Sequence, residues 1–247
     1  MEDEKIAHAA TLLGTAHRIV ALTGAGFSRP SGIPDFRSGT GLWSTFNPQE
    51  VASLRGFRHH PQRFYDWFRP LLTPILQAAP NPAHYALAAL EQSRRLSAVI
   101  TQNIDGLHQR AGSREVFELH GHMRSATCLE CEHQVPTINM LPLIQRGGVP
   151  RCSCGGLLKP DVVLFGEDLP RGIFWLARQA IEQSDTLIVA GTSLEVYPVC
   201  DLPVEAQRRG ARLIMINLSP THLDTQADVV LHADVAKVLP AIVARVI

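Results

Sequence analysis

The sequence predicts an α/β fold in which helices cover both faces of a parallel sheet, with a smaller second lobe. Short apolar runs rich in Val, Ile and Leu alternate with stretches of helical periodicity, and this alternation is typical of parallel strands joined by helices. Strands are expected at residues 19–22, 98–100, 116–119, 187–190 and 213–216, and helices at 5–15, 82–93, 172–183 and 203–209. With 247 residues, 45% of them hydrophobic, the chain can bury the core that such a sheet requires.

The second lobe is predicted from two segments that break the alternation. Residues 38–80 are rich in aromatic residues and proline, and we expect short helices and loops there. Residues 123–158 contain four of the five cysteines. We expect the two segments to pack together as the small lobe.

Polar or glycine residues follow every predicted strand. They are Thr23-Gly24-Ala25-Gly26, Thr101-Gln102-Asn103-Ile104-Asp105, His120-Gly121, Gly191-Thr192-Ser193 and Asn217. Ordinary turns would explain the Gly, Asn, Asp and Ser residues, but not Gln102 or His120. Because ligands of open α/β sheets bind outside the carboxyl ends of the strands, the pattern predicts one shared ligand crevice.

The glycine loop Gly24-Ala25-Gly26 would let the backbone approach a pyrophosphate. It is only half of a dinucleotide fingerprint, because Arg29 takes the sixth position and no second strand ends in an acid about 20 residues later. An ordinary dehydrogenase is therefore disfavoured. Phe36 and Arg37 follow in a Pro/Gly/Ser-rich segment, which suits either a lid over the ligand or a surface loop with Phe36 in the core.

The clustered cysteines predict a structural zinc site. Cys128 and Cys131 form a CxxC pair, and Cys152 and Cys154 form a CxC pair about 20 residues later, as in a zinc ribbon. Four thiolates would complete a tetrahedral site and leave no open position for catalysis. His122 or His133 could replace one cysteine, and the four-cysteine set is the simpler prediction. The fifth cysteine, Cys200, is expected to pack as a small apolar residue.

The sequence offers His120 as a general base. A period of two in the run 116–120 puts Phe117 and Leu119 on one face and Glu118 and His120 on the other, so that His120 ends the strand facing the crevice. An imidazole suits proton transfer near neutral pH. His108 lies in a helical stretch, where a histidine more often packs or makes hydrogen bonds, and we therefore assign the chemistry to His120.

The charge balance disfavours several classes of partner. Lys plus Arg and Asp plus Glu both total 23, with no long run of either sign, so neither a nucleic-acid surface nor an anionic membrane partner is expected. The acidic, amphipathic start does not resemble a signal peptide, and no run approaches the roughly 18 apolar residues of a membrane span. We expect a cytoplasmic protein, in which thiols stay reduced and favour metal binding.

Taken together, these features resemble the sirtuins, the family of NAD-dependent protein lysine deacylases. The resemblance rests on motifs that occur in the family's order between Thr23 and about Val235: Gly24-Ala25-Gly26-Phe27-Ser28, Gly32-Ile33-Pro34-Asp35-Phe36-Arg37, Thr101-Gln102-Asn103-Ile104-Asp105, Leu119-His120-Gly121, the four cysteines, Phe165-Gly166-Glu167, Gly191-Thr192-Ser193-Leu194 and Asn217. Their joint occurrence is far more specific than any single motif.

The resemblance implies a single catalytic unit of two lobes that bind NAD and an acyl-lysine peptide between them. A Rossmann-like lobe would comprise residues 1–37, 81–121 and 159–247, and a small lobe would comprise a helical part, 38–80, and a zinc ribbon, 122–158. The implied NAD contacts are Gly24, Ala25, Gly26, Arg29, Phe36, Arg37, Gln102, Asn103, Ile104, Asp105, His120, Gly191, Thr192, Ser193, Asn217, Leu218 and Val235. Ile104 and Asp105 would hold the nicotinamide amide, for which a carboxylate is a suitable acceptor.

The resemblance also implies the chemistry. The acyl oxygen would attack the ribose carbon as nicotinamide leaves, and His120 would act as base through the ribose hydroxyls, so that the acyl group passes to ADP-ribose. Asn103 would order the hydroxyls or a water, and Phe36 would shield the reacting carbon. The peptide would add as a strand between two edges, at Val162, Val163, Phe165, Gly166, Glu167, Val196 and Tyr197.

The acyl preference follows from a departure from one branch of the family. Members that prefer acidic acyl chains carry a Tyr-x-x-Arg pair in the small lobe, where this chain has Phe68 and Leu71. Tyr65 and Arg69 are spaced one residue too far apart to supply it. An apolar pocket should favour acetyl and longer neutral chains over succinyl.

Three rival functions fit parts of the sequence. A protein ADP-ribosyltransferase could use the same scaffold without an acyl-lysine. A non-catalytic module that binds NAD or zinc would not need His120, Asn103 and Asp105, and their presence argues against it. A nucleic-acid-binding zinc ribbon is disfavoured by the neutral charge.

Overall fold

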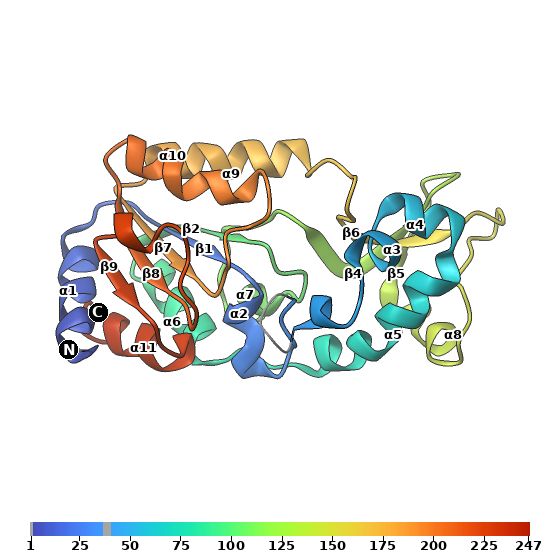
Figure 1. Ribbon diagram of the computed structural model, residues 1–247, viewed down its shortest axis with the longest axis horizontal. Coiled ribbons are helices and arrows are strands. Elements are labelled where there is room, and N and C mark those ends of the chain that lie inside the picture. The colour runs from blue at the N-terminus through green and yellow to red at the C-terminus, as the bar shows by residue number, and fades with distance from the viewer. Residues whose placement is uncertain (1, 37–40) are drawn as a thin grey trace.

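The computed structural model describes residues 2–36 and 41–247 and shows two lobes (Figure 1). The larger lobe contains a six-stranded sheet in the order β3-β2-β1-β7-β8-β9, in which every pair of neighbours is parallel. Its strands are β1 (Ile19–Thr23), β2 (Leu96–Thr101), β3 (Val116–Glu118), β7 (Thr186–Ala190), β8 (Arg212–Ile216) and β9 (Val229–Leu231). The five predicted strands are confirmed. The sixth, β9, was not predicted.

Helices cover both faces of this sheet, as predicted. α1 (Glu2–Thr15), α6 (Pro82–Gln92) and α11 (Val235–Val243) lie on one face, and α9 (Arg171–Gln183) and α10 (Leu202–Arg208) lie on the other (Figure 1). Ile19 and Ala21 pack into the first layer, whereas Val20 and Leu22 pack into the second, as the two-residue period of a strand requires. Burial on both faces explains why these strands are continuous apolar runs.

Helix α11 was not among the predicted helices. Its buried residues, Val235, Val238, Leu239, Ile242 and Val243, keep a helical spacing, although Pro240 lies inside the helix. The Asp234 side chain accepts a hydrogen bond from the Ala236 N–H and so caps the helix. The apolar face of α11 then packs against α1 and α6.

The small lobe combines a helical part with a three-stranded antiparallel sheet. The helices are α3 (Pro48–Val51), α4 (Leu54–His59), α5 (Pro61–Gln77) and α8 (Leu141–Gln145), and the sheet has the order β5 (Gln134–Pro136), β4 (Gly121–Cys128), β6 (Leu158–Val162). Side chains of both segments, among them Phe57, Phe64, Met123 and Leu158, share one apolar cluster. The two segments that break the alternation therefore pack together.

The expectation of only short helices in residues 38–80 is wrong for α5, a single helix of 17 residues. Pro70 and Pro74 suggested breaks, but the buried residues of α5, among them Phe64, Phe68 and Leu71, keep a helical spacing. Burial of this face outweighs the loss of two backbone hydrogen bonds.

Shorter elements complete the chain. They are the single-turn helices α2 (Ala25–Ser28) and α7 (Leu107–Arg110) and 3-10 turns at Arg29–Ser31, Leu42–Ser44, Thr137–Asn139, Val199–Asp201 and Asp224–Gln226. Within the described residues, no helix has the length and apolar character needed to cross a membrane.

Candidate active site

The strand ends meet where the strand order reverses. β1 pairs with β2 on one side and β7 on the other, so the connections after these strands lead away in opposite directions and leave a crevice. Two adjoining cavities occupy this place. We call them the sheet-end cavity, about 560 Å³, bounded by Gly26, Thr192 and Asn217, and the inter-lobe cavity, about 260 Å³, bounded by Trp67, Val163 and Glu167. Six residues line both cavities: Ala25, Phe36, Gln102, Asn103, His120 and Val196.

Most predicted site residues lie on these two cavities. The sheet-end cavity is lined by Ala25, Gly26, Arg29, Phe36, Gln102, Asn103, His120, Gly191, Thr192, Ser193, Asn217, Leu218 and Val235. The inter-lobe cavity is lined by Ile104, Asp105, Val162, Val163, Phe165, Gly166, Glu167, Val196 and Tyr197. Gly24 lines neither, and Arg37 lies outside the described residues.

The glycines hold two strand ends together. A Cβ on Gly24 would lie 2.7 Å from Thr192 Cβ, and a Cβ on Gly191 would lie 2.1 Å from the Phe27 nitrogen. Gly191 also has φ +66°, which favours glycine. The Gly26 N–H donates to the Gly191 carbonyl at 2.8 Å. These glycines therefore permit the loops after β1 and β7 to touch, in addition to any approach of a phosphate.

A chain of hydrogen bonds joins Asn103 and Asp105 through Ser28. The Asn103 amide donates to the Ser28 hydroxyl at 3.0 Å, and the Ser28 hydroxyl donates to Asp105 Oδ2 at 2.7 Å. The Asn103 amide also donates to the Gly24 carbonyl at 3.0 Å, which explains why Gly24 lies behind the cavity wall. Ser28 was not among the predicted site residues, although it belongs to the quoted glycine motif.

Asp105 is a buried carboxyl group. Burial raises its pKa, although hydrogen bonds from the Leu107 N–H and the Ser28 hydroxyl oppose the shift. The Leu107 N–H reaches Oδ1 at 2.9 Å, so each carboxyl oxygen has one protein donor. A carboxylate has about four acceptor positions, so it can accept a further donor from a ligand.

His120 is oriented by the backbone. Its Nδ1 lies 3.0 Å from the Gln102 carbonyl oxygen. A carbonyl only accepts, so Nδ1 carries the proton, and the lone pair of the neutral ring lies on Nε2. The ring is half-buried and lines both cavities. Phe117 and Leu119 share the apolar layer under α9, as the predicted alternation requires.

Gln102, Thr192 and Asn217 form a second network. The Gln102 amide donates to the Thr192 hydroxyl at 2.9 Å, and the Thr192 N–H donates to Asn217 Oδ1 at 2.9 Å. Asn217 Nδ2 is buried, with no hydrogen-bond partner among the described residues. A buried amide donor without a partner is unfavourable, and a ligand hydroxyl in the sheet-end cavity would satisfy it.

His108 lies behind the site. It is 1% exposed, lines neither cavity, and has its Nε2 2.9 Å from the Thr23 hydroxyl. Burial, and secondarily the charge of His84, lowers its pKa well below the usual value, so the ring stays neutral. These contacts fit the packing and hydrogen-bonding role predicted for it.

Phe36 lines both cavities and also packs against Trp43, with ring centroids 5.1 Å apart. The ring therefore joins the small-lobe apolar cluster while it lines the cavities, and the role of this segment as a lid stays a prediction. Arg29 forms an ion pair with Asp35 at 3.3 Å.

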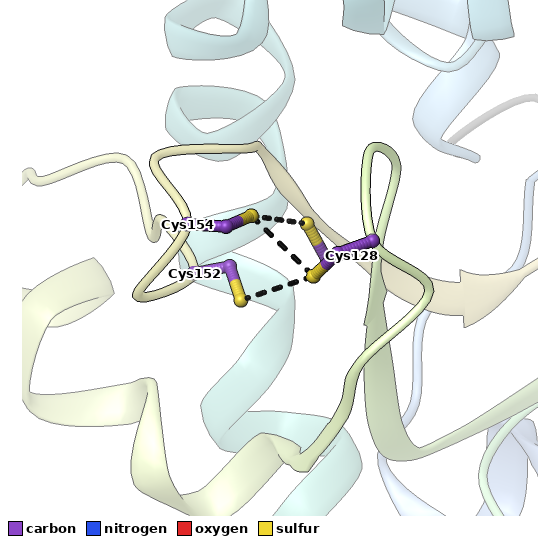
Figure 2. Close-up of side chains that lie close together, drawn as sticks. Cys128, Cys152 and Cys154 are labelled. Carbon is purple, nitrogen blue, oxygen red and sulfur yellow. Dashed lines mark hydrogen bonds between the residues drawn. The ribbon is translucent and has the colours of Figure 1, made fainter.

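The four cysteines lie together at one end of the small-lobe sheet. Figure 2 shows Cys128, at the end of β4, and Cys152 and Cys154, in the loop before β6, pointing toward one another. Three sulfur–sulfur distances are 3.4 Å for Cys154 and Cys131, 3.5 Å for Cys128 and Cys154, and 3.7 Å for Cys131 and Cys152. All four ligand atoms lie within 4.8 Å of one another.

This cluster fits a zinc ion. Tetrahedral zinc with bonds of about 2.3 Å would place its sulfur ligands about 3.8 Å apart. The backbone N–H of Cys154 lowers the pKa of Cys152 to about 6. A backbone bond from His133 lowers the pKa of Cys131, but the neighbouring thiols outweigh it and raise that pKa to about 12. A bound cation would favour the thiolate form of Cys131 and so offset the effect of the neighbouring thiols.

Several lining residues were not predicted individually. Among them are Trp43, Phe64, Trp67 and Ile75, which form the small-lobe wall of the inter-lobe cavity together with Phe68. Their signal was the aromatic richness of residues 38–80, which indicates apolar surface but not which side chains face a cavity. Phe68 and Leu71 were expected at the acyl pocket, and of these two only Phe68 lines the cavity. The fifth cysteine, Cys200, packs against the apolar layer under α9, as predicted.

Comparisons with known proteins agree with this geometry. The family model for the Sir2 family matches residues 24–198. The NAD-dependent protein deacylase 2 of Archaeoglobus fulgidus is 46% identical over 100% of this chain and 97% of its own length. The structure of Sir2Af2 bound to a myristoylated histone peptide has a TM-score of 0.86 at 40% identity, covering 99% of this chain and 97% of that one. A Sir2 structure with a deacetylated p53 peptide and 3'-O-acetyl ADP-ribose has a TM-score of 0.93 at 38% identity, covering 97% of both chains.

Proposed function

This chain belongs to the Sir2 family and is an NAD-dependent protein deacylase, and from that premise we propose how its residues share the reaction and which acyl groups it removes. NAD is its cosubstrate, and the four cysteines hold a structural zinc ion. The observation that carries the proposal is the place of His120, which lines both cavities. We assign the sheet-end cavity to the ADP-ribose part of NAD and the inter-lobe cavity to the acyl-lysine.

The sheet-end cavity offers donors suited to ribose and phosphate. The unpartnered Asn217 amide would donate to a ribose hydroxyl, with Gln102 and Thr192 fixing its orientation through their hydrogen bonds. Arg29 supplies a cation on the same cavity. Asp105, which lines the adjoining inter-lobe cavity, would accept a hydrogen bond from the nicotinamide amide.

His120 would accept the proton, and Asn103 would orient the ribose hydroxyl that gives it up. NAD supplies the ribose carbon that accepts the acyl oxygen as nicotinamide leaves. Because Nδ1 of His120 is held by Gln102, Nε2 is the atom that would take a proton from a ribose hydroxyl. The Asn103 side chain is fixed by Gly24 and Ser28, so it can orient the hydroxyls beside that imidazole.

The inter-lobe cavity favours neutral acyl chains. Its wall is formed by Phe64, Trp67, Phe68 and Ile75, and among the described residues no Lys or Arg lines it. Arg69 instead donates to the Ile144 carbonyl at 2.7 Å and pairs with Asp66. A carboxylate in this cavity would be desolvated without a cation, so acetyl and longer neutral chains should be removed faster than succinyl.

We also propose where the acyl-lysine peptide binds and in which cellular compartment the protein works. Residues 162–167 and 196–197 both border the inter-lobe cavity, so an extended acyl-lysine peptide would pair with these edges through its main chain. The side chains of the peptide would then contribute little to its recognition.

Four thiols gathered for a metal favour a reducing compartment such as the cytoplasm. The balanced charge of the chain disfavours direct nucleic-acid binding.

The test is mass spectrometry of an acetyl-lysine peptide incubated with the protein, with and without NAD, beside the variant His120→Ala. We expect loss of the acetyl group and formation of an acylated ADP-ribose only with NAD and only in the unmodified enzyme. Loss without NAD, or undiminished loss in the variant, would contradict the proposal. A heavier protein or peptide without acyl loss would indicate ADP-ribosyl transfer instead.

A further inference from the structure

A buried ion pair lies behind the proposed peptide edge. Lys159, on β6, is 9% exposed. Its Nζ donates to Glu167 Oε2 at 3.1 Å and to the backbone carbonyls of Val162 at 2.8 Å and Pro160 at 3.2 Å. The ammonium group therefore has three acceptors, which a buried charge requires.

Glu167 completes the arrangement from the other end of the loop. The same Oε2 accepts the Leu164 N–H at 2.8 Å, and the Glu167 N–H donates to the Leu164 carbonyl at 3.0 Å. Although Glu167 borders the inter-lobe cavity, this oxygen is engaged within the protein. The ion pair thus holds the carbonyl of Val162 and the N–H of Leu164, on either side of Val163.

The loop is also tied to the catalytic histidine and to the helical part of the small lobe. The Val163 N–H donates to the His120 carbonyl at 2.9 Å. Phe165 exchanges two backbone hydrogen bonds with residues 52 and 54, both within 3.0 Å. Val163 therefore has a fixed position relative to His120 only while the peptide units on both sides of it are held.

A buried ion pair by itself is weak support for stability, because the desolvation of both charges offsets much of their attraction. What this pair does specifically is fix two backbone groups on either side of Val163, the Val162 carbonyl and the Leu164 N–H. We infer that Lys159 and Glu167 are positioning residues for the acyl-lysine peptide, which set the backbone of residues 162–167 without contacting substrate through the paired atoms. The inference rests on the proposed function, since it concerns the peptide edge of the same site.

The test compares Lys159→Met, Glu167→Gln and the double variant. In Lys159→Met we expect the KM for an acetyl-lysine peptide to rise by about tenfold, with kcat and the affinity for ADP-ribose within about twofold of the unmodified enzyme. The double variant should bind peptide better than Lys159→Met alone, because it leaves no unpaired buried carboxylate. Lys159→Arg, which keeps the charge, should restore part of the affinity.

Tyr65→Phe, on α5, is a matched control because its hydroxyl contacts the same strand, β6. The Tyr65 hydroxyl donates to the Leu158 carbonyl at the start of β6, away from the loop. This variant should lower the melting temperature without changing the peptide KM. A similar rise in KM in Tyr65→Phe, or an unchanged KM in Lys159→Met and Glu167→Gln, would overturn the inference.

A direct binding measurement separates the proposed function from the positioning role of Lys159 and Glu167. Binding of the acetyl-lysine peptide is measured by fluorescence anisotropy with ADP-ribose present. Absence of turnover in the unmodified enzyme, with peptide still bound, would overturn the proposed function. Peptide affinity that is equal in the unmodified enzyme and in Lys159→Met would overturn the positioning role alone.

Discussion

His120 Nδ1 lies 3.0 Å from the carbonyl oxygen of Gln102, and this contact determines which ring nitrogen can act as a base. The donor is necessarily the imidazole N–H, since a carbonyl cannot donate. Gln102 thus has two roles, because its side chain joins the network with Thr192 while its backbone orients the histidine. The following predictions depend on this geometry and on the groups around it.

Replacing His120 by Ala should lower kcat for deacylation by roughly 10²- to 10⁴-fold, the usual contribution of a positioned general base. Affinity for ADP-ribose, measured by calorimetry, should change little. His59→Ala, at an exposed position on α4, serves as the control and should retain activity. Activity in His120→Ala close to that of the control would show that the base is elsewhere.

Asp105→Asn should weaken binding at the nicotinamide end. The Asn side chain offers one acceptor oxygen in place of two, and that oxygen would still be needed by the Ser28 hydroxyl or the Leu107 N–H. We expect a higher KM for NAD and weaker inhibition by nicotinamide, with ADP-ribose affinity nearly unchanged. Equal inhibition of both enzymes by nicotinamide would refute this assignment.

Substituting Cys128 and Cys152 by Ser should release one zinc ion per chain and lower the melting temperature, because each contributes one of four ligands. Metal content can be measured by inductively coupled plasma mass spectrometry. Cys200→Ser is the matched control, since Cys200 lies outside the cluster, and it should retain the zinc. A zinc content unaffected by the double substitution would exclude the site.

Stability should fall on acidification because of His84. Burial lowers the pKa of His84 from 6.5 to about 4. Between these two pH values the unfolded chain therefore binds a proton that the folded protein does not. The contribution is present above pH 6.5 and is lost as the pH falls toward 4, to a limit on the order of 3 kcal/mol.

Urea unfolding at pH 7 and pH 5 measures this loss. His84→Gln should show a smaller difference between the two pH values than the unmodified protein. Acid release of zinc would affect both proteins alike and cancels in that comparison. Identical differences in both proteins would indicate that another group is responsible.

Matched peptides should be deacylated in an order set by acyl charge. We expect acetyl and pentanoyl lysine to be removed with a similar kcat/KM, and succinyl lysine at least about tenfold more slowly, because a tenfold difference requires only about 1.4 kcal/mol of unfavourable desolvation. Pentanoyl is the control for chain length. Faster removal of succinyl than of acetyl would show that a cation reaches the cavity.

Local patterns in the sequence determined much of the fold and the positions of the site residues. Runs such as residues 187–190 are strands because both faces are buried, and the cysteine spacing alone indicates a metal cluster. Polar residues at the ends of parallel strands necessarily share one edge of the sheet, so Gln102 and Asn217 could be assigned to one crevice from the sequence.

Only the tertiary structure decided the contacts between residues far apart in the chain. Three such contacts are the close approach of Gly24 to Gly191, the hydrogen bond that places the proton of His120 on Nδ1, and the ion pair of Glu167 with Lys159. The physical reason is that periodicity records which face of an element is apolar, whereas a hydrogen bond depends on the distance and angle between two elements. The sequence therefore located the site, and the packing of its strands and loops against one another assigned these polar atoms their partners.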